Sequence, residues 1–185
     1  TWEQDFKSEG TKNIFFWEPN QVLSSLINLL EEVNANLIIR THWMWRGKLK
    51  EDILKVIEQH PNVVYAPMED YPDTSELLSV TDVLITDWSS IATDFMLSKK
   101  PIIFIDVPDP FHGNFCLGPD DRAGKVAKNL DELIKLIREA IRNREDFLKS
   151  YSKNLEKVLD KAFLHKDGKA TERVITAIEE LMHRI

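Results

Sequence analysis

The sequence has 185 residues, which is long enough for one domain with a substantial core. Hydrophobic residues make up 43% and charged residues 30%, so a disordered chain is excluded. No apolar run approaches the roughly 18–20 residues that a bilayer span needs. The net charge is -7 and no Lys/Arg cluster is longer than a pair, which argues against nucleic acid as a partner. The single cysteine, Cys116, cannot form an internal disulfide and fits a reducing compartment.

Short apolar runs alternate with helical patterns along the first half of the chain. Runs of consecutive apolar residues predict strands over 13–17, 37–39 and 63–65. Apolar residues at three- and four-residue spacing predict helices over 21–34 and 48–60. A short helix with Leu77 and Leu78 follows the third strand, and Thr74 or Ser75 is its expected N-cap.

The second half begins with the stretch that the rest of the chain is organised around. A buried strand over 82–85 runs into a helix for which Ser89 or Ser90 is the expected N-cap. The next strand covers 102–105, and an irregular stretch over 106–126 follows it. Helices are then predicted from Asp131, over 145–163 and after Gly168. Three helices are more than one sheet face needs, so one of them is expected to contact something outside this chain.

This order of elements predicts an α/β fold. Five short strands, each followed by a helix or a long loop, indicate a doubly wound parallel sheet that is covered on both faces and carries extra C-terminal helices. Neither an internal repeat nor a linker is visible, so residues 1–185 are predicted to form a single domain. The first residues include neither a signal-peptide pattern nor an initiator methionine, so we expect a fragment of a longer protein.

Polar residues follow the strands and are expected to meet at the carboxyl edge of the sheet. Ser89 and Ser90 stand where a strand meets a helix N-terminus, a position that attracts phosphate. His42 is the only histidine placed directly after a strand and can donate to a phosphate or act as an acid or base. Asp94 lies one helical turn beyond Ser90, where a carboxylate would accept from a polyol or sugar hydroxyl.

The acidic and histidine residues of the irregular stretch do not predict a metal site. Their spacing matches no metal template, so we expect neither a metal nor another cofactor. The residues considered are Asp106, Asp109, His112, Asp120 and Asp121.

Several of these segments together resemble the CDP-glycerol glycerophosphotransferase family, the teichoic acid polymerases and primases. The resemblance rests on Arg40-Thr41-His42, on 82–90 with its Asp87-Trp88-Ser89-Ser90 block, on Asp94-Phe95 and on 100–104. The family usually has a proline where this chain has Trp43 and a tyrosine where it has Trp88. The resemblance covers nearly the whole chain and implies the Rossmann-like, C-terminal nucleotide-binding half of a GT-B fold.

The resemblance also implies roles for individual residues. Ser89 and Ser90, with Thr86 and Asp87, would hold the diphosphate of a CDP-linked polyol donor, and Asp94 would bind donor hydroxyls. His42 would act at the diphosphate and help CMP to leave. Arg40 and Arg122 are further candidates for donor contacts.

The implied reaction transfers a polyol phosphate to a polymer or lipid-linked acceptor on the cytoplasmic side, with possible peripheral contact to the membrane. The presumed general base of the family is a histidine in an amino-terminal half that this chain lacks. The chain is therefore expected to bind donor without turning it over, and the missing half is an expected partner.

Alternative interpretations remain open at this stage. The serines could merely cap a helix, His42 could satisfy a loop backbone, and Asp94 could stabilise a helix dipole. The domain could belong to a GT-B nucleotide-sugar glycosyltransferase, or to a transferase-like protein that binds without catalysis. A dinucleotide-binding oxidoreductase and an α/β-hydrolase are disfavoured because their glycine motifs are absent.

Overall fold

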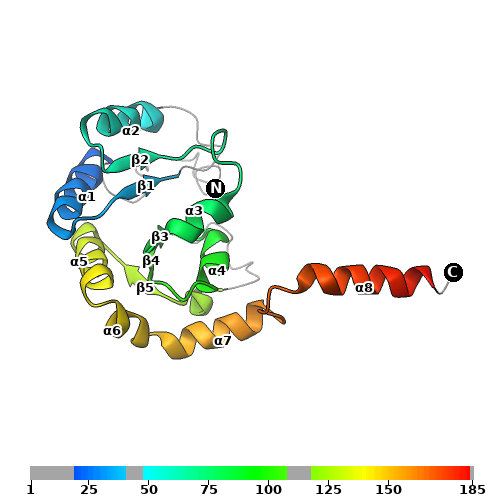
Figure 1. The fold of residues 1–185 in the computed structure, drawn as a ribbon. Helices are drawn as coiled ribbons and strands as arrows, with labels where there is room; N and C mark the ends of the chain where they lie inside the picture. The colour runs from blue at the N-terminus through cyan, green and yellow to red at the C-terminus, as the bar shows by residue number, and fades with distance from the viewer. Residues whose placement is uncertain (1–18, 41–47, 108–117, 184–185) are drawn as a thin grey trace, which may run out of the picture.

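The computed structural model describes residues 19–40, 48–107 and 118–183. The first part contains α1 (Pro19–Val33), β1 (Leu37–Ile39), α2 (Lys48–Gln59), β2 (Val63–Tyr65), α3 (Thr74–Val80), β3 (Leu84–Thr86) and α4 (Ile91–Met96). The second part contains β4 (Ile102–Ile105), the 3-10 turn η2 (Pro119–Asp121), β5 (Lys125–Ala127), α5 (Leu130–Arg142), α6 (Arg144–Lys149), α7 (Ser152–Ala162) and α8 (Ala170–Met182). Figure 1 shows their arrangement.

All strand pairings among the described residues are parallel, as the sequence predicts. β1 pairs with β2, and β4 lies between β3 and β5 in a second sheet. The strands predicted at 37–39, 63–65 and 102–105 are confirmed, and the one predicted over 82–85 is confirmed with its bounds shifted to Leu84–Thr86. The strand predicted over 13–17 lies outside the described residues.

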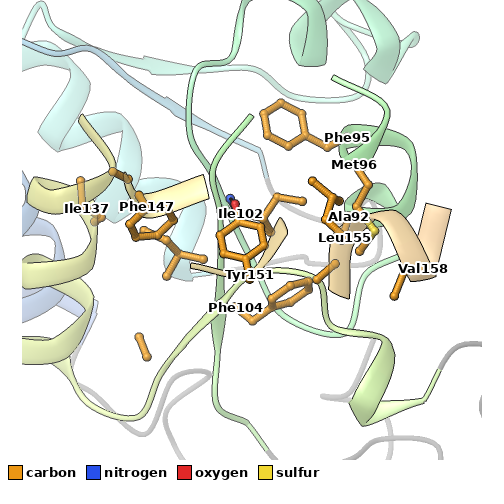
Figure 2. Close-up of a cluster of buried hydrophobic side chains, with 14 of the residues drawn as sticks. Ala92, Phe95, Met96, Ile102, Phe104, Ile137, Phe147, Tyr151, Leu155 and Val158 are labelled. Atoms are coloured by element: carbon orange, nitrogen blue, oxygen red, sulfur yellow. Dashed lines mark hydrogen bonds between the residues drawn. The ribbon is translucent and has the colours of Figure 1, made fainter. Parts of the chain in front are cut away.

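The hydrophobic core is built around β4. All four of its side chains are buried in core clusters, and its backbone is paired with a neighbouring strand along both edges. Figure 2 shows Ile102 and Phe104 among side chains of α4, α5, α6 and α7. The buried hydroxyl of Tyr151 accepts a hydrogen bond from the Ile102 N–H (3.2 Å), and the Phe147 ring meets the Tyr151 ring edge-on. Burial raises the pKa of Tyr151.

The two sheets are connected through α1 and α5, which pack side by side (Figure 1). Leu29 of α1 is buried in the same core cluster as Leu133 and Ile137 of α5. On the surface, Glu32 of α1 accepts hydrogen bonds from Arg138 (2.8 and 2.9 Å) and from Arg142 (2.8 Å). These guanidinium groups, Arg138 first, lower the pKa of Glu32.

Three sequence-based expectations about local structure are wrong. The N-cap of α3 is Asp73, whose carboxylate accepts from the Ser75 N–H, so neither Thr74 nor Ser75 caps it. The stretch 106–126 is not wholly irregular, because it holds η2 and the start of β5. The helical stretch over 145–163 is two helices, α6 and α7, and the buried Tyr151 lies at the junction between them.

The final helix, α8, is confirmed, and Figure 1 shows it extending away from the rest of the fold. None of its residues is buried, and five apolar side chains are 51–70% exposed: Val174, Ile175, Ile178, Leu181 and Met182. That one of the later helices contacts something outside this chain stays a prediction. No described helix combines the length and the apolar character that crossing a membrane requires.

Gly124 is predicted to be essential for the close approach of β5 to β4. A Cβ added at Gly124 would lie 2.6 Å from the Ile102 carbonyl oxygen and 2.9 Å from the Phe104 ring. Because backbone cannot move aside cheaply, Gly124→Ala should lower the free energy of unfolding by about 1–3 kcal/mol. Chemical denaturation measures this change.

Gly118→Ala is the matched control, since nothing lies within 4 Å of a Cβ added there. It should leave the free energy of unfolding close to that of the wild type. Equal stability of the two variants would contradict the proposed tight contact between β5 and β4.

Candidate functional site

A pocket of about 200 Å³ lies beside β4, between the segment that follows β3 and the segment that precedes β5. One wall follows β3 and continues into α4, and the other is formed by η2 and the residue after it. Met96 and Phe104 contribute apolar surface between these walls. The lining residues are Asp87, Trp88, Ser89, Ser90, Ala92, Thr93, Met96, Phe104, Gly118, Asp121 and Arg122.

The two serines stand at the mouth of this pocket, and both are exposed. Their carbonyl oxygens accept from the amides of Ala92 (3.2 Å) and Thr93 (2.9 Å), which builds the first turn of α4. Ser90 occupies the N-cap position, as expected, but its backbone is helical (φ -60, ψ -19) and its hydroxyl makes no capping hydrogen bond. The expectation that its side chain caps the helix is therefore wrong, and helix capping does not account for this hydroxyl.

Arg122 forms the opposite wall. Its guanidinium carbon lies 3.4 Å from the centre of the Trp88 ring and 5.8 Å from that of Phe104. Nη1 lies 3.8 Å from a carboxylate oxygen of Asp106, and the Arg122 side chain is only 10% exposed. A cation is thus held beside the serines, although the chain as a whole is acidic.

The loop that carries Arg122 is fixed by contacts with α7. Asn154 Nδ2 donates to the Arg122 carbonyl (3.3 Å), and Lys161 Nζ donates to Asp121 (2.6 Å). The same carboxylate accepts from the Gly118 N–H (2.8 Å). Lys161, with Gly118, lowers the pKa of Asp121, so the negative charge on this pocket wall is largely compensated.

The structure brings some of the predicted site residues together and leaves others apart. Asp87, Ser89, Ser90 and Arg122 line the pocket. Thr86 ends β3 and is half-buried, and it is not a lining residue. Asp94 is exposed in the first turn of α4, outside the pocket lining.

Arg40 is not among the residues that line the described pocket. Arg40 follows β1, and its Nη1 donates to the backbone carbonyls of Tyr71 (2.9 Å) and Ala66 (3.3 Å), which ties the end of β1 to the loop after β2. His42 lies outside the described residues.

Trp88 is the site residue that sequence reasoning missed. Its indole N–H donates to the Val107 carbonyl (3.1 Å), and its ring supports Arg122. Its position between Asp87 and Ser89 was the only available signal, because the contact with Arg122 depends on the tertiary structure. Within the described part of the chain, no group of three or more His, Cys, Asp or Glu side chains could hold a metal ion.

Comparison with known proteins gives a consistent picture. A family model described as CDP-Glycerol:Poly(glycerophosphate) glycerophosphotransferase matches residues 4–180. A teichoic acid poly(ribitol-phosphate) polymerase of Bacillus spizizenii (strain ATCC 23059 / NRRL B-14472 / W23) is 33% identical over 71% of this chain and 22% of its own length. The ribitol-phosphate polymerase TarK of Staphylococcus aureus (strain NCTC 8325 / PS 47) is 28% identical over 81% of this chain and 27% of its own length. The chain thus spans about a quarter of these relatives.

Solved structures support the fold. A variant of the wall teichoic acid polymerase TagF, soaked with CDPG for 30 minutes, superposes with a TM-score of 0.62. The match covers 91% of this chain and 41% of that one at 22% identity. At this identity the likeness establishes the α/β fold alone.

The geometry of Ser90 predicts that its hydroxyl contributes nothing to stability. Ser90→Ala should change the free energy of unfolding by less than about 0.5 kcal/mol, as for an exposed side chain without a structural bond. Asn129→Ala serves as the comparison, because the Asn129 side chain accepts from the Glu132 N–H (2.8 Å) and caps α5. Loss of that cap should cost about 1 kcal/mol in the same denaturation assay. A comparable cost for Ser90→Ala would restore the capping interpretation.

Proposed function

Because the chain belongs to the CDP-glycerol:poly(glycerophosphate) glycerophosphotransferase family, we propose that it supplies the donor-binding part of a polyol-phosphate transferase. Its donor is a CDP-linked polyol, glycerol phosphate or a similar group is transferred, and the acceptor is a cell-surface polymer or a lipid-linked precursor. The observation that carries this proposal is the pocket that joins Ser89 and Ser90 to Arg122.

The donor diphosphate binds at the mouth of this pocket. The hydroxyls of Ser89 and Ser90 and the backbone N–H groups near Asp87 donate to its oxygens, and Thr86 supports this loop from the end of β3. Arg122 supplies the positive charge, which an acidic domain must provide locally. The Ser90 hydroxyl, which has no capping role, and the buried Arg122 guanidinium in the same pocket support this assignment.

Asp94 accepts hydrogen bonds from donor hydroxyls just outside the pocket. Its position in the first turn of α4, on the same side as Ser90, supports this role. Arg40 acts indirectly, since its guanidinium is already bonded to the backbone of the 66–71 loop.

The reaction is an in-line displacement at the β-phosphorus of the donor. The acceptor oxygen forms a bond to this phosphorus as the bond to the bridging oxygen of CMP breaks, so the products are a phosphodiester and CMP. His42 contacts the diphosphate and donates a proton or a hydrogen bond to the departing CMP. The proton of the acceptor hydroxyl passes to a base outside this chain.

Residues 1–185 act as one nucleotide-diphosphate-binding unit within a larger two-domain enzyme. The coverage of only about a quarter of the curated relatives supports this organisation. The isolated chain binds donor without turnover, and the larger enzyme works at the cytoplasmic face of the membrane through peripheral contact.

Calorimetric titration of the chain with CDP-glycerol, CDP-ribitol and UDP-glucose tests the donor class. We expect a CDP-polyol to bind selectively. Preference for UDP-glucose would indicate a nucleotide-sugar transferase, and absence of binding to all three would contradict the donor-binding role of this chain.

Ser90→Ala should weaken CDP-polyol binding by roughly 1.5–3 kcal/mol, because it removes a hydrogen bond to a charged group. This corresponds to about a 10- to 150-fold increase in Kd. Ser98→Ala is the matched control, since Ser98 follows the same helix outside the pocket and its hydroxyl donates to the Phe95 carbonyl (2.7 Å). An unchanged Kd in a folded Ser90→Ala variant would remove the phosphate role from this residue.

His42→Ala in the complete transferase should lower kcat by about 100-fold or more, the usual contribution of a positioned general acid. The donor KM should change less, because the serines and Arg122 remain. Turnover can be followed by CMP release, and a rate near that of the wild type would assign His42 a structural role only.

A further inference from the structure

The two walls of the pocket come from distant parts of the sequence, and one contact joins them directly. Trp88 lies in the loop after β3, whereas Arg122 enters β5 from the opposite end of the parallel sheet. The Arg122 guanidinium nevertheless lies 3.4 Å from the centre of the Trp88 ring. This distance is typical of a guanidinium stacked flat on an indole, the aromatic face that binds cations most strongly.

Both partners of this stack are held in place from other directions. The indole N–H donates to the carbonyl of Val107, a buried residue two positions after the end of β4. The Arg122 carbonyl accepts from Asn154 of α7, and the Asp106 carboxylate lies near the guanidinium. The stack therefore connects the ends of β3 and β4 with α7, and Ser89 and Ser90 follow Trp88 immediately in the chain.

We propose that Trp88 is a positioning residue, which through its stack with Arg122 fixes the Ser89–Ser90 turn against the opposite wall of the pocket. The importance of this role for binding rests on the proposed function. A diphosphate that enters the pocket then meets the hydroxyls and the guanidinium already at a set separation, so little ordering remains to be done on binding. Trp88 itself need not touch the donor.

Amide hydrogen exchange in the absence of ligand tests the positioning directly. The amides of Ala92 and Thr93 donate to the carbonyls of Ser89 and Ser90, so their protection reports how firmly this turn is held. In Trp88→Leu and in Arg122→Gln, exchange at both amides should become about tenfold faster. The Leu133 amide, which bonds to the Asn129 carbonyl in α5, should keep its wild-type rate and show that the fold is intact.

Conservative variants separate the stack from general packing. Trp88→Phe keeps an aromatic face under the guanidinium and should retain most of the protection. Arg122→Lys keeps the charge but loses the planar stack, so it should exchange like Arg122→Gln. If Trp88→Leu does not fold, the Trp88→Phe and Arg122→Lys pair decides the question. Wild-type exchange at Ala92 and Thr93 in both Arg122 variants would overturn the proposal.

A second measurement connects the positioning to binding of CDP-glycerol. If Trp88 sets the serine turn, Ser90→Ala should raise Kd by at least tenfold in the wild type but by less than about threefold in the Trp88→Leu background. Equal fold-changes in the two backgrounds would overturn the proposal. If the wild-type chain does not bind CDP-glycerol, the proposed donor is wrong, while the exchange experiment still decides whether Trp88 positions the turn.

Discussion

Burial of β4 is the constraint on which the rest of the structure depends. None of its four residues has an exposed side chain, so its backbone polar groups must find partners within the protein. β3 and β5 satisfy those along its two edges, and the Tyr151 hydroxyl accepts from the N–H of Ile102 at its start. Pro101, which precedes the strand, has no N–H to satisfy, and its carbonyl accepts from Leu84. Tyr151 lies between α6 and α7, so this hydrogen bond ties the junction of the two helices to the start of β4.

The pocket is a consequence of how closely the neighbours of β4 approach it. Since β3 and β4 run parallel in register, Trp88 after β3 comes within hydrogen-bonding distance of Val107 after β4. On the other edge, Gly124 lets the chain pass against the Ile102 carbonyl, so the residue two positions earlier, Arg122, lies over Phe104 and reaches Trp88. The site is thus built where two loops cross the face of one strand, and its geometry is tied to the most buried part of the fold.

Elements and site residues could be predicted from the sequence where the local pattern and the tertiary structure favour the same conformation. A short run that is apolar throughout, such as Ile102–Ile105, predicts a buried strand. The serine pair could be placed because it lies between a predicted strand and a predicted helix. β5 could not be found in this way, since Lys125–Ala127 is a strand only through its pairing with β4. The N-cap of α3 was predicted wrongly because Asp73, Thr74 and Ser75 are all good N-cap residues. A difference of one residue in where α3 starts decides among them. The contact between Trp88 and Arg122 joins residues 34 positions apart, and no local pattern encodes it.

The choice of an aromatic partner for Arg122 has an electrostatic consequence for an acidic chain. A guanidinium that is paired closely with a carboxylate contributes little net charge to its surroundings, whereas one that lies on an indole face remains a full cation. Three carboxylates surround Arg122 and the serines, and two of them, Asp87 and Asp121, line the pocket itself. Asp121 is paired with Lys161, and Asp106 is half-exposed and 3.8 Å from the guanidinium, where water weakens the pairing. A chain with a net charge of -7 thus places a cation in the same pocket as Ser89 and Ser90, held on the face of Trp88.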